Sequence, residues 1–113
     1  MKRNDIILGK MLHYSVKALS FVKDTDKQAF LCNDEKQYAV CLALIQIGEL
    51  VTHLSDEYRE SNPNIPWKKI KGLRNIIVHQ YGSVDVDLLW QLVSVELAGL
   101  SEEIKHQINN TEE

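Results

Sequence analysis

The chain has 113 residues, of which 44% are hydrophobic and 26% charged, proportions that exclude a disordered or fibrous protein. This length predicts one domain spanning residues 1–113. The formal net charge of −3 excludes a protein that coats nucleic acid through a general positive field, so any contact with nucleic acid must be local.

Helical periodicity dominates the first half of the chain. Apolar residues recur every three or four positions and predict a first helix over about residues 4–23. Residues 24–26 supply turn and N-cap chemistry for a short second helix, and Asn33 or Asp34 offers the next cap. From Asp34 to about Glu60 the pattern is periodic and free of proline, which predicts one long central helix.

Two prolines interrupt this pattern. Pro63 and Pro66 lack backbone donors and predict a surface loop. Helical spacing resumes at Trp67, and Gly82 lies where a left-handed C-terminal cap is commonly needed. We therefore expect this helix to end at Tyr81 or Gly82.

The last helix is expected to follow a cap within residues 83–85 and to run to about Gln107, with residues 109–113 as a frayed tail. No convincing stretch alternates with the period of a β-strand. The fold class predicted is therefore all-α, an up-and-down bundle of four to five helices.

The sequence shows neither a basic-then-apolar leader nor an apolar run long enough to cross a bilayer, so we expect a cytoplasmic protein without membrane contact. Cys32 and Cys41 have neither CxxC spacing nor a histidine cluster beside them, and we expect buried thiols rather than a metal site. No cofactor is expected either.

Residues 67–81 concentrate the chemistry of the chain, W-K-K-I-K-G-L-R-N-I-I-V-H-Q-Y. On a helix that advances about 100° per residue, Arg74 and Tyr81 nearly eclipse, whereas Arg74 and His79 diverge by about 140°. Arg74 and His79 would then converge best at an interface between two copies of the helix, which predicts a homodimer.

These residue types match the needs of RNA cleavage. A histidine with a pKa near ~6.5 exchanges protons at neutral pH, and an arginine fork holds a phosphate while negative charge builds on it. The 2′-hydroxyl of RNA is the nucleophile, so no metal is required. Arg74 and His79 are the candidate catalytic residues and Asn75 the supporting one, while Lys68, Lys69 and Lys71 would steer RNA.

Structural interpretations stay open for the same residues. His79 could cap a helix dipole, Tyr81 could be a half-buried aromatic, and the lysines could form a solvated face. Glu49 suits either a structural hydrogen bond or a site role. Asp85 stands at a helix start, where capping explains it best.

The segment 74–81 resembles the R-N-x-x-x-H-x-Y signature of HEPN-domain toxins called HepT, which are encoded beside a minimal nucleotidyltransferase antitoxin called MntA. Every signature position is filled, by Arg74, Asn75, His79 and Tyr81. The similarity extends upstream to Gly48 and downstream to Trp90, and covers essentially the whole chain.

This resemblance implies the toxin of a type VII toxin–antitoxin system, a homodimer in which Arg74 and His79 of both subunits line one cleft and cleave RNA without metal. It also implies that the antitoxin neutralises the toxin by transferring AMP from ATP to Tyr81. The alternative is a non-catalytic HEPN-like module that binds a nucleotide or a nucleotidyltransferase without cutting RNA.

Overall fold

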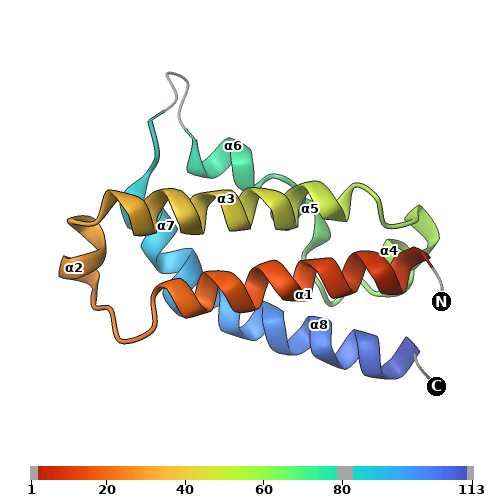
Figure 1. Cartoon of the computed structure of the whole chain (residues 1–113). Coiled ribbons are helices and arrows are strands. Elements are labelled where there is room, and N and C mark those ends of the chain that lie inside the picture. Colours follow the sequence, from red (N-terminus) through yellow and green to blue (C-terminus); the bar gives the residue numbers. More distant parts are fainter. Residues whose placement is uncertain (1–2, 79–82, 112–113) are drawn as a thin grey trace.

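The computed structural model describes residues 3–78 and 83–111. All the regular secondary structure in these ranges is helical. Helix α1 (Arg3–Phe21) runs antiparallel to α3 (Asp34–Val51) and packs against both α3 and α8 (Leu97–Thr111) (Figure 1). The short helices α5 (Trp67–Lys71) and α6 (Leu73–Ile77) lie on α3. The predicted all-α up-and-down bundle is confirmed.

Helix α1 buries one stripe of residues, at the spacing that places them on one face of a helix: Ile7, Leu8, Met11, Ser15 and Ala18. The Ser15 hydroxyl donates a hydrogen bond to the Met11 carbonyl at 2.9 Å, so this buried polar group is satisfied. The helix covers Arg3–Phe21, close to the predicted range of 4–23.

The predicted caps form at two helix starts. Asp26 accepts a hydrogen bond from the Ala29 amide at 2.8 Å and begins α2 (Lys27–Leu31). Asn33 accepts one from the Lys36 amide at 3.0 Å and begins α3. The C-cap of α2, Cys32, is exposed, so the prediction of two buried thiols is wrong for this residue.

The prediction of one long central helix that runs to Glu60 is wrong, because α3 ends at Val51 and α4 (Asp56–Ser61) begins after a break. The Ser55 hydroxyl caps α4 by accepting from the Tyr58 amide at 3.2 Å. Asn4 of α1 binds both the amide and the hydroxyl of Ser55, each at 3.2 Å. The bend is therefore fixed by a partner far away in the sequence.

The helix predicted from Trp67 to Tyr81 or Gly82 also ends early. Gly72 separates α5 from α6, and α6 ends at Ile77. Val78 is extended (φ −100°, ψ 120°) and pairs with Val84 in an isolated antiparallel bridge. The Asp85 amide donates to the Ile77 carbonyl at 2.8 Å, so pairing across the chain replaces the next helical turn.

The C-terminal helices begin where predicted. Asp85 accepts from the Leu88 amide at 3.0 Å and caps α7 (Val86–Gln91). A π-helical segment, η1 (Leu92–Glu96), joins α7 to α8, and the Ser94 hydroxyl in it bonds back to the Trp90 carbonyl at 2.6 Å. Helix α8 continues to Thr111, beyond the predicted end at residue 107 and into the predicted tail.

The helix continues there because Ile108 still packs, partly buried, against the hydrophobic core. The centre of that core consists of large side chains with under 2% exposure, among them Leu8, Met11, Phe30, Leu44, Ile47, Ile77, Leu89 and Ile104. Across the described ranges, no helix combines the length and the apolar character needed to cross a bilayer.

Helix α5 approaches α3 closely at Gly48. A Cβ atom placed on Gly48 would lie 2.7 Å from the Ile70 carbonyl oxygen, closer than such atoms approach in proteins. The absent side chain thus lets the backbone of α5 rest directly on α3. By contrast, a Cβ atom on Gly9 or Gly99 would meet nothing within 4 Å.

This contact predicts opposite effects for matched glycine substitutions. Gly9→Ala and Gly99→Ala should leave the melting temperature unchanged or raise it, since alanine favours a helix by roughly 1 kcal/mol. Gly48→Ala gains the same propensity but displaces a backbone carbonyl, at a cost of about 1–3 kcal/mol for overpacking. It should therefore lower the melting temperature measured by circular dichroism. Equal stability of the three variants would contradict the close contact.

Candidate functional site

Helix α6 presents the first half of the R-N-x-x-x-H-x-Y signature on the surface. Leu73 and Ile77, four residues apart, are buried and hold the helix against α3. Arg74, Asn75 and Ile76, which lie between these two anchors, are exposed. The guanidinium of Arg74 is therefore carried by a short, well-anchored helix, where it can meet a phosphate from solvent.

The second half of the signature, His79 and Tyr81, lies outside the described residues. The expected angle between Arg74 and His79 assumed that one helix carried both, and the expected eclipse of Arg74 and Tyr81 assumed the same. Helix α6 ends at Ile77 and Val78 is extended, so the helix that carries Arg74 stops before His79.

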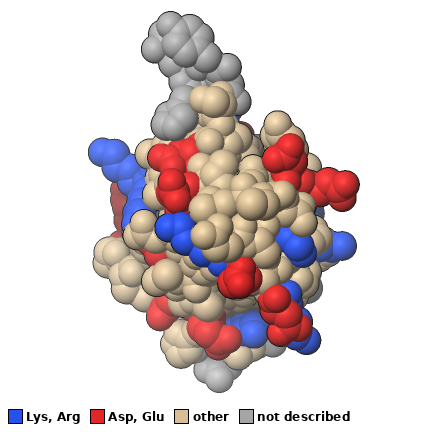
Figure 2. Space-filling view, turned by 90° about the vertical axis from the view of Figure 1, so that its left-hand side faces the viewer, with Lys and Arg blue, Asp and Glu red and all other residues tan. Residues whose placement is uncertain are grey.

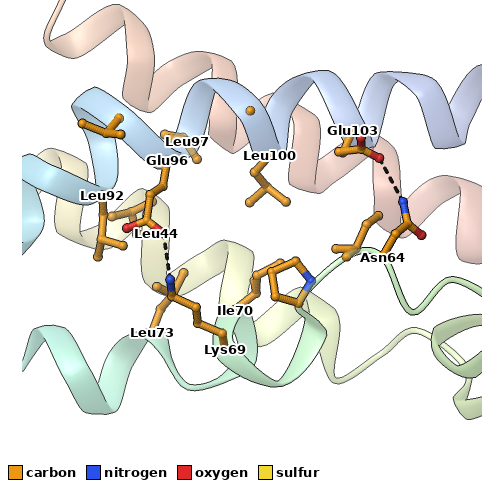
Figure 3. Close-up of a pocket in the computed structure, with 14 residues that line it drawn as sticks. Leu44, Asn64, Lys69, Ile70, Leu73, Leu92, Glu96, Leu97, Leu100 and Glu103 are labelled. Carbon is orange, nitrogen blue, oxygen red and sulfur yellow. Dashed lines mark hydrogen bonds and ion pairs between the residues drawn. The ribbon is translucent and has the colours of Figure 1, made fainter.

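The lysines of α5 do not share one face. Lys68 and Lys71, three residues apart, line a surface hollow of about 450 Å³. Asp56, Arg59, Glu60 and Trp67 line the same hollow. Lys69 instead forms an ion pair with Glu96 of η1, with 2.8 Å between Nζ and Oε1 (Figure 3). The sequence places the three lysines together, and the fold separates them.

A cavity of about 520 Å³ lies between α5 and the C-terminal helices, and sequence reasoning did not find it (Figure 3). Its walls are mainly apolar, including Ile70, Leu73 and Leu100. Two polar contacts cross the cavity. One is the Lys69–Glu96 pair, and the other is a 3.3 Å hydrogen bond that the side-chain amide of Asn64 donates to the Glu103 carboxylate. Since its lining comes from three separated parts of the chain, no local sequence signal could have revealed it.

Other candidate groups have structural roles or lie apart. Burial raises the pKa of the Cys41 thiol, which disfavours the thiolate that a nucleophile or metal ligand needs. Glu49 is exposed, so the partly buried role considered for it does not hold. Within the residues that the structure describes, no group of three or more potential metal-binding side chains comes together.

Charges are mixed at the end of the bundle shown in Figure 2. Acidic and basic side chains alternate around a broad uncharged area, and no field of one sign covers this face. This arrangement agrees with the net charge of −3. With this net charge, a polyanion would be attracted by local groups of cationic side chains rather than by a uniformly basic surface.

Comparison with known proteins places the chain in a family. The family described as "Ribonuclease HepT-like" matches residues 11–107. "Putative RNase MJ1380" of Methanocaldococcus jannaschii is 36% identical over 107 residues, which are 93% of this chain and 98% of that protein. "Probable ribonuclease HepT" of Thermococcus cleftensis is 32% identical over 80 residues, 71% of this chain and 73% of that protein.

A second protein of Methanocaldococcus jannaschii, "Putative RNase MJ0125", is 34% identical over 115 residues and covers 100% of this chain and 99% of its own. No solved structure matches the chain. The family match spans all the helices from the middle of α1 to the last turns of α8, including the segment that carries Arg74. The chain belongs to the HepT-like ribonuclease family.

Proposed function

We propose that the chain is the toxin of a type VII toxin–antitoxin pair, a metal-independent endoribonuclease that acts on cytoplasmic RNA through Arg74 and His79. The observation that carries this proposal is the exposed Arg74 on the anchored helix α6, five residues before His79 in a chain of the HepT-like ribonuclease family. The names of the relatives, which describe RNases, support the reaction class.

The proposed reaction needs only groups of the chain and of its substrate. The RNA 2′-hydroxyl attacks the adjacent phosphorus as His79 accepts its proton, and the bond to the 5′-oxygen breaks. The leaving oxygen receives a proton from solvent, to which His79 later returns the proton it accepted, and the products are a 2′,3′-cyclic phosphate and a 5′-hydroxyl end. Arg74 stabilises the charge on the phosphoryl oxygens, and Asn75 beside it orients the phosphate by hydrogen bonding.

Replacing the two proposed catalytic residues should abolish cleavage without unfolding the protein. We expect Arg74→Ala and His79→Ala each to lower the rate of RNA cleavage by about 10²–10⁴-fold, the usual size of a lost acid–base or electrostatic contribution. His53→Ala, at an exposed histidine after α3, is the matched control and should keep full activity. Normal cleavage by a folded His79→Ala protein would refute the assignment, whereas a folded wild-type chain that cleaves no RNA would favour the non-catalytic module.

We further propose that two copies of the chain form the active unit, a homodimer in which both motif segments contribute to one cleft. Sedimentation at micromolar concentration should give twice the mass of the chain. Dilution below the dissociation constant should lower the specific activity, because each site loses the groups of the second copy. A monomer with full specific activity would exclude the shared cleft.

Tyr81 is proposed as the point of control, which an MntA-like nucleotidyltransferase modifies by transferring AMP from ATP. The tyrosine oxygen attacks the α-phosphorus of ATP, its proton is released, and pyrophosphate leaves. The added phosphate brings negative charge close in sequence to Arg74, where it would compete with an RNA phosphate.

Tyr81→Phe should therefore escape neutralisation. We expect this variant to stay toxic when the partner nucleotidyltransferase is co-produced, and intact-mass spectrometry should show AMP on the wild-type protein but none on the variant. Tyr38→Phe is the matched control, because Tyr38 is exposed on α3 and should leave neutralisation unchanged. If Tyr81→Phe is neutralised as well as the wild type, control works by complex formation alone.

A further inference from the structure

Helix α5 directs its cations to two different sides. Successive residues of a helix diverge by about 100°, so Lys69 cannot share a side with both Lys68 and Lys71. Lys68 and Lys71 line the hollow that Arg59 of α4 also lines. Lys69 extends the opposite way and pairs with Glu96 across the apolar cavity (Figure 3).

The two sides differ in their charge balance. Three cationic side chains, Arg59, Lys68 and Lys71, and two carboxylates line the hollow. One of these carboxylates, Asp56, is already paired with Arg59. The charged residues that line the cavity are one cation, Lys69, and two carboxylates, Glu96 and Glu103. The other walls of the cavity are mainly apolar. A phosphate backbone is thus attracted to the hollow and is disfavoured along the cavity.

The hollow also lies next to the proposed catalytic helix. The Gly72 amide closes α5 by donating to the Lys68 carbonyl at 3.1 Å, and the Asn75 amide donates to the Gly72 carbonyl at 3.0 Å. These bonds carry the chain from α5 into α6 with little interruption. Arg74 follows Lys71 by three residues, so a strand bound at the hollow would lie near the segment that carries the guanidinium.

We propose that the RNA backbone crosses the Lys68–Lys71 side of α5 and that Glu96 holds Lys69 out of this contact. The inference rests on the proposed function for its substrate, RNA. It narrows the steering role expected of all three lysines to Lys68 and Lys71. Glu96 is then a residue that limits which face binds RNA.

Salt dependence of binding separates the lysines. Binding of a fluorescein-labelled oligouridylate by the full chain is measured by anisotropy over a range of salt concentrations, in the His79→Ala background so that the RNA stays intact. Each lost phosphate contact reduces the slope of log affinity against log salt by about 0.7 for a single strand. Lys68→Gln and Lys71→Gln should each reduce the slope by this amount, and Lys69→Gln, the matched control, should leave it unchanged.

Adding a positive charge at the hollow or at the cavity tests the same proposal by strengthening RNA binding instead of weakening it. Glu60→Lys, in the hollow, should steepen the slope by about one phosphate contact, whereas Glu103→Lys, at the cavity, should not. Equal effects of Lys69→Gln and Lys68→Gln, or of the two charge reversals, would overturn the proposed track, as would a full chain that does not bind the RNA. Binding with the expected slopes but without cleavage by the wild type would instead reject only the catalytic proposal.

Discussion

The contact between Gly48 and the Ile70 carbonyl fixes how the motif-bearing part of the chain meets the rest of the bundle. Two backbones can approach this closely only where one of them carries no side chain, and here the central helix supplies that gap. Helix α5 rests on α3 at this point, and the next helix, α6, also packs against α3. The position of Arg74 is therefore set by packing against α3, although its own side chain lies in solvent.

A second constraint defines where the helical part of the signature stops. The run Ile76, Ile77 and Val78 consists of β-branched residues, which tolerate a helix but favour extended backbone. Pairing of Val78 with Val84 satisfies backbone groups that another helical turn would have used. Arg74 and Asn75 are thus held by a helix that ends at Ile77, and Val78 after it is extended. A reactive geometry between Arg74 and His79 need not follow helical spacing.

The positions of the cationic side chains decide where RNA can approach this chain. An acidic protein of the HepT-like ribonuclease family must attract RNA through a small number of cations. The fold places Lys68, Lys71 and Arg59 around one hollow and commits Lys69 to Glu96 on the other side of α5. The apolar cavity beside that ion pair separates α5 from η1 and α8, and its two carboxylates leave it unsuited to a phosphate backbone.

Much of the local structure could be predicted from the sequence, because its causes act within one helical turn. The helical class, the caps at Asp26, Asn33 and Asp85, and the proline loop all follow from neighbouring residues. The signature from Arg74 to Tyr81 was also legible, since it depends on residue identity alone. What local patterns could not supply was the place where each helix ends and the side to which each charge points.

Those features depended on partners distant in sequence. Asn4 binds Ser55 in the break between α3 and α4, although the periodic pattern of the sequence continues through this break. Glu96 takes Lys69 away from the lysines beside it. The sequence by itself determined the helices, their caps and the family signature, whereas only the tertiary structure decided the breaks and the separation of the cations, because both arise from contacts between segments that periodicity does not relate.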